Sequence, residues 1–113
     1  MQYRRLGRSG LMVSGLTLGT MNFGGPTDDA TAFKMIDMAL DQGINILDCA
    51  NVYRDGASEK VLGKALARDG KREKVLLTSK AFLPTGTAPN TSGNNRHNLI
   101  NSCLASLKRL QCD

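Results

Sequence analysis

The sequence alternates between two patterns of apolar residues. Short runs dense in leucine, isoleucine, valine and threonine are typical of buried strands; they lie at 16–20, 44–48 and 74–80. In longer segments the apolar residues recur every three or four positions, as in helices that bury one face; these segments span 28–42, 58–69 and 99–110. Each run is followed by one periodic segment, so the pattern predicts a strand and then a helix, three times over.

The helices carry recognisable local signals. Acidic residues occupy the first turn of 28–42, where the helix dipole favours them, and Gly43 stands at the position of a C-terminal cap. Ser58 is expected to be the N-cap of the second helix. The apolar face of that helix comprises Val61, Leu62, Ala65 and Leu66. The apolar face of the third helix comprises Leu99, Ile100, Cys103, Leu104, Leu107 and Leu110.

Two shorter runs, at 4–6 and 11–13, precede the first strand. The glycine-bounded turn between them predicts an antiparallel hairpin. The strict alternation that follows favours a parallel sheet with right-handed crossovers, in a single α/β domain that spans 1–113. Because another strand is due after the last helix, we expect this domain to be incomplete.

Composition narrows the function classes. The net charge is +5, but the basic positions of 57–80 are mixed with acids and the chain has few aromatic residues, so a solvated surface is expected rather than a nucleic-acid site. Binding to RNA stays open as a third alternative. No apolar run approaches the ~18 residues of a membrane helix and no secretory signal is visible, so the cytoplasm is the expected compartment. Cys49, Cys103 and Cys112 lack metal or redox spacing and are expected to be free thiols.

Three polar residues are predicted to meet at the carboxyl ends of the parallel strands, where α/β folds place their active sites. Asp48 ends the second strand, Tyr53 lies five residues further on, and Lys80 ends the third strand. Neighbouring strands lie ~4.8 Å apart, so Asp48 and Lys80 can pair and the loop can fold Tyr53 over them.

An aspartate, a tyrosine and a lysine together suit one kind of proton transfer. A phenol ordinarily titrates near pH ~10, a neighbouring ammonium group favours its ionised form, and a carboxylate keeps that ammonium charged and oriented. Such a cluster can protonate the alkoxide that develops when hydride is delivered to a carbonyl carbon. Each residue alone also has a structural explanation: a cap for Asp48, cover of the core for Tyr53, and solvation for Lys80.

Several separated motifs resemble the aldo-keto reductase family, and together they cover nearly the whole chain in order. They are Leu18-Gly19-Thr20-Met21, Asp48-Cys49-Ala50-Asn51-Val52-Tyr53, Gly56-Ala57-Ser58-Glu59, Leu62-Gly63, Thr78-Ser79-Lys80 and Ser106-Leu107-Lys108-Arg109-Leu110. The similarity is greatest to the branch that contains the potassium-channel β subunits and bacterial general-stress reductases.

This resemblance implies the N-terminal part of a (β/α)₈ TIM barrel, closed at its base by the hairpin, that binds NADPH without a glycine-rich dinucleotide fingerprint. It implies reduction of aldehydes and ketones to alcohols, with a small carbonyl compound as the substrate. Tyr53 would be the general acid, Lys80 would ease loss of its proton, and Asp48 would hold Lys80. The residues expected against the nicotinamide and its ribose are Gly19, Thr20, Met21 and Asp48.

The sequence departs from the family pattern at several positions. Cys49 stands where threonine is usual, and Arg54 follows the tyrosine where glycine is common. The family's catalytic histidine follows its fourth strand, which is not reached by Asp113. His97 matches no catalytic position and is expected at the surface. The contacts to the adenosine 2′-phosphate are also expected beyond this segment. The preference for NADP over NAD is therefore implied by the resemblance alone. A non-catalytic or regulatory barrel module that acts through protein interaction stays open as the alternative function.

Overall fold

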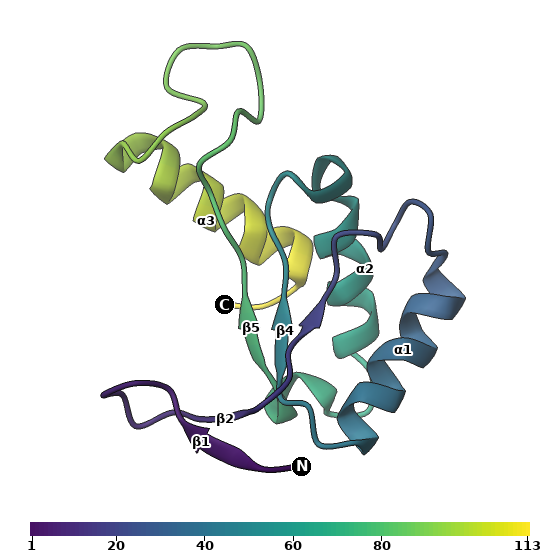
Figure 1. The fold of residues 1–113 in the computed structure, drawn as a ribbon. Coiled ribbons are helices and arrows are strands. Elements are labelled where there is room, and N and C mark those ends of the chain that lie inside the picture. Colours follow the sequence, from purple (N-terminus) through teal and green to yellow (C-terminus); the bar gives the residue numbers. More distant parts are fainter.

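A three-stranded parallel sheet is the centre of the computed structural model, which describes residues 1–113 (Figure 1). The strands β3 (Leu18–Gly19), β4 (Ile46–Asp48) and β5 (Leu76–Thr78) lie in that order. Asp48 is opposite Gly19 on one side and Thr78 on the other. The predicted parallel sheet is confirmed, although each strand is shorter than its apolar run.

The N-terminal hairpin is also confirmed. Strands β1 (Tyr3–Arg5) and β2 (Met12–Ser14) pair antiparallel and cross the end of the sheet opposite to the 81–94 loop (Figure 1). Asn45 fixes the hairpin, since its Oδ1 accepts from the Ser14 N–H at 2.8 Å and its Nδ2 donates to the Met12 carbonyl at 2.9 Å. The Asn45 carbonyl also accepts from the Leu76 N–H at 2.7 Å, so Asn45 ties the hairpin to the N-terminal ends of β4 and β5.

The helices are α1 (Asp29–Asp41), α2 (Ala57–Leu66) and α3 (Arg96–Leu110), with two short 3₁₀ turns, η1 (Tyr53–Gly56) and η2 (Lys71–Lys74), that the apolar pattern did not predict. The helix predicted at 28–42 is confirmed, with Gly43 directly after its last residues as predicted. Asp28 is the N-cap and its Oδ1 accepts from the Thr31 N–H at 2.7 Å, which lowers the pKa of Asp28. Gly43, with φ of 82°, provides the left-handed turn after the helix.

The N-cap predicted for α2 is wrong. Gly56, with φ of 84°, precedes the helix, while Ser58 lies inside its first turn and is completely buried. The Ser58 hydroxyl donates to the Thr20 carbonyl at 2.7 Å. A tertiary partner at the end of β3 therefore takes the hydroxyl that a local capping rule assigned to the helix N-terminus.

The hydrophobic core lies between the sheet, α1 and α2. It comprises Phe23, Ala32, Ile36, Leu47, Cys49, Val61, Leu62, Ala65, Leu66, Val75 and Leu110. The predicted face of α2 is thus confirmed. The cysteines are free thiols, as predicted, and Cys49 is a buried core residue.

Helix α3 packs differently from the expectation of a buried apolar stripe. Its buried residues are Asn98, Ser102, Ser106 and Leu110, while Leu99 and Leu104 are exposed. The helix lies very close to α2, where a Cβ at Gly63 would be 2.5 Å from the Arg109 carbonyl oxygen. The absence of a side chain at Gly63 permits this approach.

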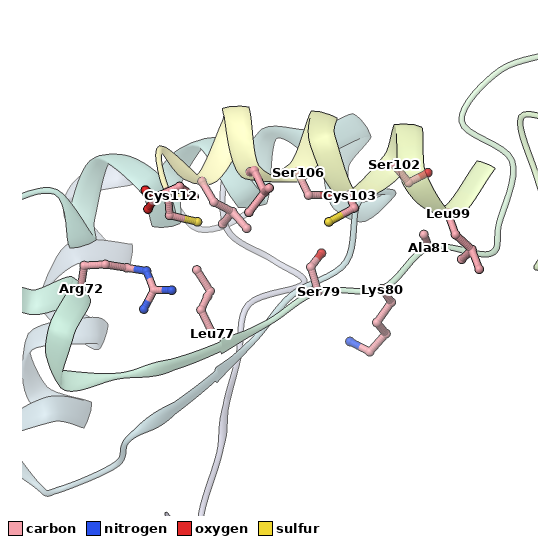
Figure 2. A pocket seen from close by; sticks show the side chains of 13 residues that line it. Arg72, Leu77, Ser79, Lys80, Ala81, Leu99, Ser102, Cys103, Ser106 and Cys112 are labelled. Carbon is pink, nitrogen blue, oxygen red and sulfur yellow. The ribbon is translucent and has the colours of Figure 1, made fainter. Parts of the chain in front are cut away.

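The apolar stripe of α3 instead borders a groove along β5. The groove has a volume of about 380 Å³, and its walls include Leu77, Leu99, Cys103 and Leu107 (Figure 2). Neither this helix nor any other in the structure combines the length and apolar character needed to cross a membrane.

Candidate active site

The structure brings Asp48, Tyr53 and Lys80 together at the carboxyl end of the sheet. Asp48 is the last residue of β4, Lys80 follows β5 by two residues, and Tyr53 begins η1. Lys80 Nζ lies 2.7 Å from Asp48 Oδ2 and 3.4 Å from Tyr53 Oη. The predicted convergence of these three side chains is confirmed, while their catalytic roles stay a prediction.

The Lys80 ammonium group is held from several directions. In addition to Asp48 it donates to the Cys49 carbonyl at 2.7 Å, and it lies 5.1 Å from the centre of the Tyr53 ring. Asp48 is fixed in turn by Thr78, whose hydroxyl donates to Asp48 Oδ1 at 2.7 Å. Lys80 keeps 51% of its side-chain surface exposed, so the cluster remains open to a ligand.

Asp48 and Lys80 each stabilise the charged form of the other. Partial burial would raise the pKa of Asp48, but the hydrogen bonds from Lys80 and Thr78 outweigh it, and the pKa of Asp48 is lowered. Partial burial would lower the pKa of Lys80, but the hydrogen bonds with Asp48 and Tyr53 outweigh it, and the pKa of Lys80 is raised. Asp48 is therefore anionic and Lys80 cationic throughout the neutral pH range.

The backbone that follows Tyr53 is left-handed. Arg54 and Asp55 both have φ of 52°, a conformation that glycine adopts more readily than other residues. The Arg54 side chain reaches over the loop before α1, where a Cβ at Gly25 would be 2.8 Å from Arg54 Nε. This geometry explains physically why a glycine suits the position of Arg54.

A buried network supports the site from below. The Thr20 hydroxyl donates to the Asp48 carbonyl at 2.9 Å, and Ser58 binds the carbonyl of Thr20. Cys49 Sγ lies 3.1 Å from the Ser58 hydroxyl. These contacts join the ends of β3 and β4 to α2, so they fix the backbone from which the Asp48 carboxylate projects.

The predicted cofactor residues lie next to this cluster but differ in exposure. A Cβ at Gly19 would meet nothing within 4 Å, and Met21 is 57% exposed, so the surface beside the Asp48 carboxylate has room for a flat ring and its ribose. Thr20 is only 1% exposed, and its hydroxyl is bonded within the protein. The residues present fit the nicotinamide end of a dinucleotide, and the individual contacts stay predictions.

The sequence reasoning missed several residues around the site. Thr78 holds Asp48, and the completely buried Glu59 binds both Ser79 and Arg109. A signal for Glu59 was present, because it is a charged residue on the same face of α2 as the buried leucines. His97 lies near the exposed start of α3, away from Lys80, as expected.

Comparisons with known proteins show which family the chain resembles. Residues 15–113 match the model of the aldo/keto reductase family. The chain is 47% identical over 123 residues to the Bacillus subtilis protein named "Uncharacterized oxidoreductase YrpG", and 37% identical over 114 residues to a probable voltage-gated potassium channel subunit beta from Arabidopsis thaliana. Both matches extend over 100% of this chain, and over 37% and 35% of the length of the two relatives, respectively.

A solved structure gives the same result. The holo form of the aldo-keto reductase AKR11C1 from Bacillus halodurans superposes with a TM-score of 0.83 at 35% identity, over 100% of this chain and 37% of that one. The fold is thus that of a portion of a TIM barrel. The chain belongs to the aldo/keto reductase family. It spans little more than a third of the length of these relatives.

Proposed function

We propose that residues 1–113 supply three side chains of the active site of an NADPH-dependent reductase of aldehydes and ketones. The observation that carries the proposal is the position of Lys80 Nζ, within hydrogen-bond distance of both Asp48 Oδ2 and Tyr53 Oη at the open end of the sheet. Family membership supports an oxidoreductase, and the preference for NADPH over NADH is part of the proposal.

Each side chain has a defined task in this reaction. NADPH, when bound, supplies the hydride. Tyr53 donates its phenolic proton to the substrate oxygen, and the Lys80 ammonium group stabilises the phenolate that remains. Asp48 keeps Lys80 charged and oriented. Gly19 and Met21 are proposed to border the nicotinamide, with Thr20 fixing the backbone between them.

The proposed substrate is a small carbonyl compound that is uncharged or weakly polar. We propose no nucleic-acid or membrane partner, and the cytoplasm as the site of action. A second candidate function is protein interaction by a non-catalytic barrel module, which the likeness to the Arabidopsis channel subunit favours. Turnover of a carbonyl substrate separates the two candidates.

The test of the proposed function needs a complete barrel. In the protein that we name the completed barrel, residues 1–113 replace the matching 37% of the Bacillus subtilis relative. We expect it to unfold cooperatively, to bind NADPH, and to oxidise NADPH in the presence of small aldehydes, as followed by NADPH absorbance. A folded completed barrel that binds NADPH and reduces no aldehyde or ketone would favour the interaction module instead.

Lys80→Met is expected to shift the pH profile of reduction in the completed barrel. The methionine keeps the stem of the side chain but removes the cation, so the phenolate formed in the reaction is less stable and the apparent pKa of the profile rises. The measurement is kcat/KM against pH, with Lys64→Met as control, since Lys64 pairs only with Asp29 on the exposed side of α2. An unchanged profile in a folded variant that binds NADPH would contradict the coupling.

Arg54→Gly is expected to stabilise the completed barrel relative to Arg54→Ala by about 1 kcal/mol, because only glycine removes the steric cost of a left-handed backbone. Both variants lose the same side-chain packing against Gly25, so their difference isolates the backbone. The measurement is the free energy of unfolding in urea. Equal stabilities would show that the loop relaxes out of the left-handed conformation.

A further inference from the structure

An ion pair between a buried carboxylate and a partly exposed guanidinium group joins α2 to α3. Glu59, on α2, is completely buried, and its Oε2 lies 2.6 Å from Arg109 Nε on α3. The other oxygen, Oε1, accepts a hydrogen bond of 2.6 Å from the Ser79 hydroxyl. The carboxylate therefore joins two helices to the residue that immediately precedes Lys80.

Stability alone is a weak reason for this arrangement. Moving the Glu59 carboxylate completely out of water is costly, and an ion pair with a buried partner often contributes no more than well-packed apolar side chains of similar volume. The neighbouring residues on the same face of α2, Leu62 and Leu66, are apolar and equally buried. We therefore look for the role of this ion pair in the residue that Glu59 binds, Ser79.

Within this chain the Ser79 side chain is bonded to Glu59 alone. The strand β5 ends at Thr78, and neither the N–H nor the carbonyl of Ser79 makes a hydrogen bond with another backbone group in this chain. Its hydroxyl bond to Glu59 is its one hydrogen bond. The backbone on either side is tied to the β4 loop, since the Thr78 carbonyl accepts from Cys49 N–H and the Lys80 carbonyl accepts from Asn51 N–H.

Ser79 and Lys80 project to opposite sides of the extended chain, as successive residues of a strand do. Figure 2 shows Ser79 directed toward α3 and Lys80 directed away from it. Because Ser79 and Lys80 are adjacent, a displacement of Ser79 toward or away from the helices would be transmitted to the Lys80 stem. The ammonium group makes bonds of 2.7 Å with both Asp48 and the Cys49 carbonyl, so a small displacement would lengthen them.

We propose that Glu59 is a positioning residue for Lys80, that it acts through the Ser79 hydroxyl, and that Arg109 holds Glu59 in place. The kinetic consequence of this proposal rests on the reductase function proposed above. Its geometric consequence, the placement of the Lys80 ammonium group against Asp48, can be measured without turnover.

The first measurement is the rate at which Lys80 is acetylated by limiting acetic anhydride at mildly alkaline pH, read by mass spectrometry. The raised pKa of Lys80 keeps the reactive free amine scarce, and each unit by which that pKa falls increases the free amine about tenfold. In the completed barrel, Ser79→Ala is expected to raise the rate at Lys80 about threefold or more. Asp48→Asn is the positive control, and Lys64 in the same sample is the internal reference.

The variants separate positioning from a merely structural role. Ser79→Ala leaves the Glu59–Arg109 pair intact, Ser79→Thr keeps a hydroxyl and is expected to restore the parent rate, and Glu59→Gln is expected to act in the same direction as Ser79→Ala. Ser102→Ala is the matched control. The Ser102 hydroxyl borders the same groove as Ser79, but it bonds to Asn98 and not to Glu59. The variant is expected to leave Lys80 unchanged.

The second measurement is kinetic. Ser79→Ala is expected to lower kcat about tenfold with little change in NADPH affinity, within the ~10²-fold cost that a misplacement of about 1 Å can have. Unchanged acetylation of Lys80 in Ser79→Ala, with a clear rise in Asp48→Asn, would overturn the positioning role. A completed barrel without reductase activity would overturn the proposed function, while the acetylation rates would still decide the position of Lys80.

Discussion

Tyr53→Phe in the completed barrel is expected to lower kcat/KM for aldehyde reduction by about 10²–10⁴-fold, the usual cost of losing a general acid. The phenylalanine keeps the ring that lies beside Lys80 but removes the hydroxyl at 3.4 Å from its ammonium group. Without that hydroxyl, no other side chain of the cluster is suited to donate a proton, because Asp48 is ionised and Lys80 is engaged by Asp48 and the Cys49 carbonyl.

Two further readouts make the Tyr53→Phe result specific. NADPH affinity, measured by fluorescence titration, is expected to change little, since the phenol is proposed to contact the substrate oxygen. Tyr3→Phe is the matched control, because the Tyr3 hydroxyl binds the Gly43 carbonyl at the opposite end of the sheet. Wild-type kcat/KM in Tyr53→Phe, under conditions where the chemical step limits the rate, would remove Tyr53 from the proposed mechanism.

The 113-residue chain on its own is expected to show no turnover and no tight binding of NADPH. A barrel of this class needs eight strands and typically ~250 residues, whereas this chain provides three strands of the parallel sheet. Both outer strands, β3 and β5, have one edge without a partner in this chain. Leu99, Ile100 and Leu104 are exposed on α3, so we expect self-association through these apolar surfaces.

Light scattering, NADPH titration and an assay with a reactive aldehyde test this expectation. The completed barrel is the control, and it is expected to be active under the same conditions. A well-ordered monomer of residues 1–113 that binds NADPH at micromolar concentration and turns over substrate would contradict the prediction. It would also show that the first three strand–helix units are sufficient for the site.

Much of the fold could be predicted from local patterns. The apolar period of α1 and the Asp28 cap depend on residues a few positions apart, and the hairpin depends on the turn between its strands. The convergence of Asp48 and Lys80 could also be predicted, because the carboxyl ends of parallel strands must lie at one edge of a sheet. The docking of the hairpin on the sheet needed tertiary information, since the Asn45 side chain binds Ser14 and Met12, which lie far from it in the sequence.

The sequence by itself determined the order of the elements, the parallel sheet and the three polar residues at its carboxyl end, because periodicity and strand direction follow from the chain alone. Tertiary structure decided which hydroxyls and carboxylates have partners. Ser58 bonds to Thr20 rather than capping α2, and Glu59 is buried against Ser79. It also decided that α3 buries Asn98, Ser102 and Ser106 in addition to Leu110. These outcomes depend on groups distant in the sequence, whose positions exist only once the chain has folded.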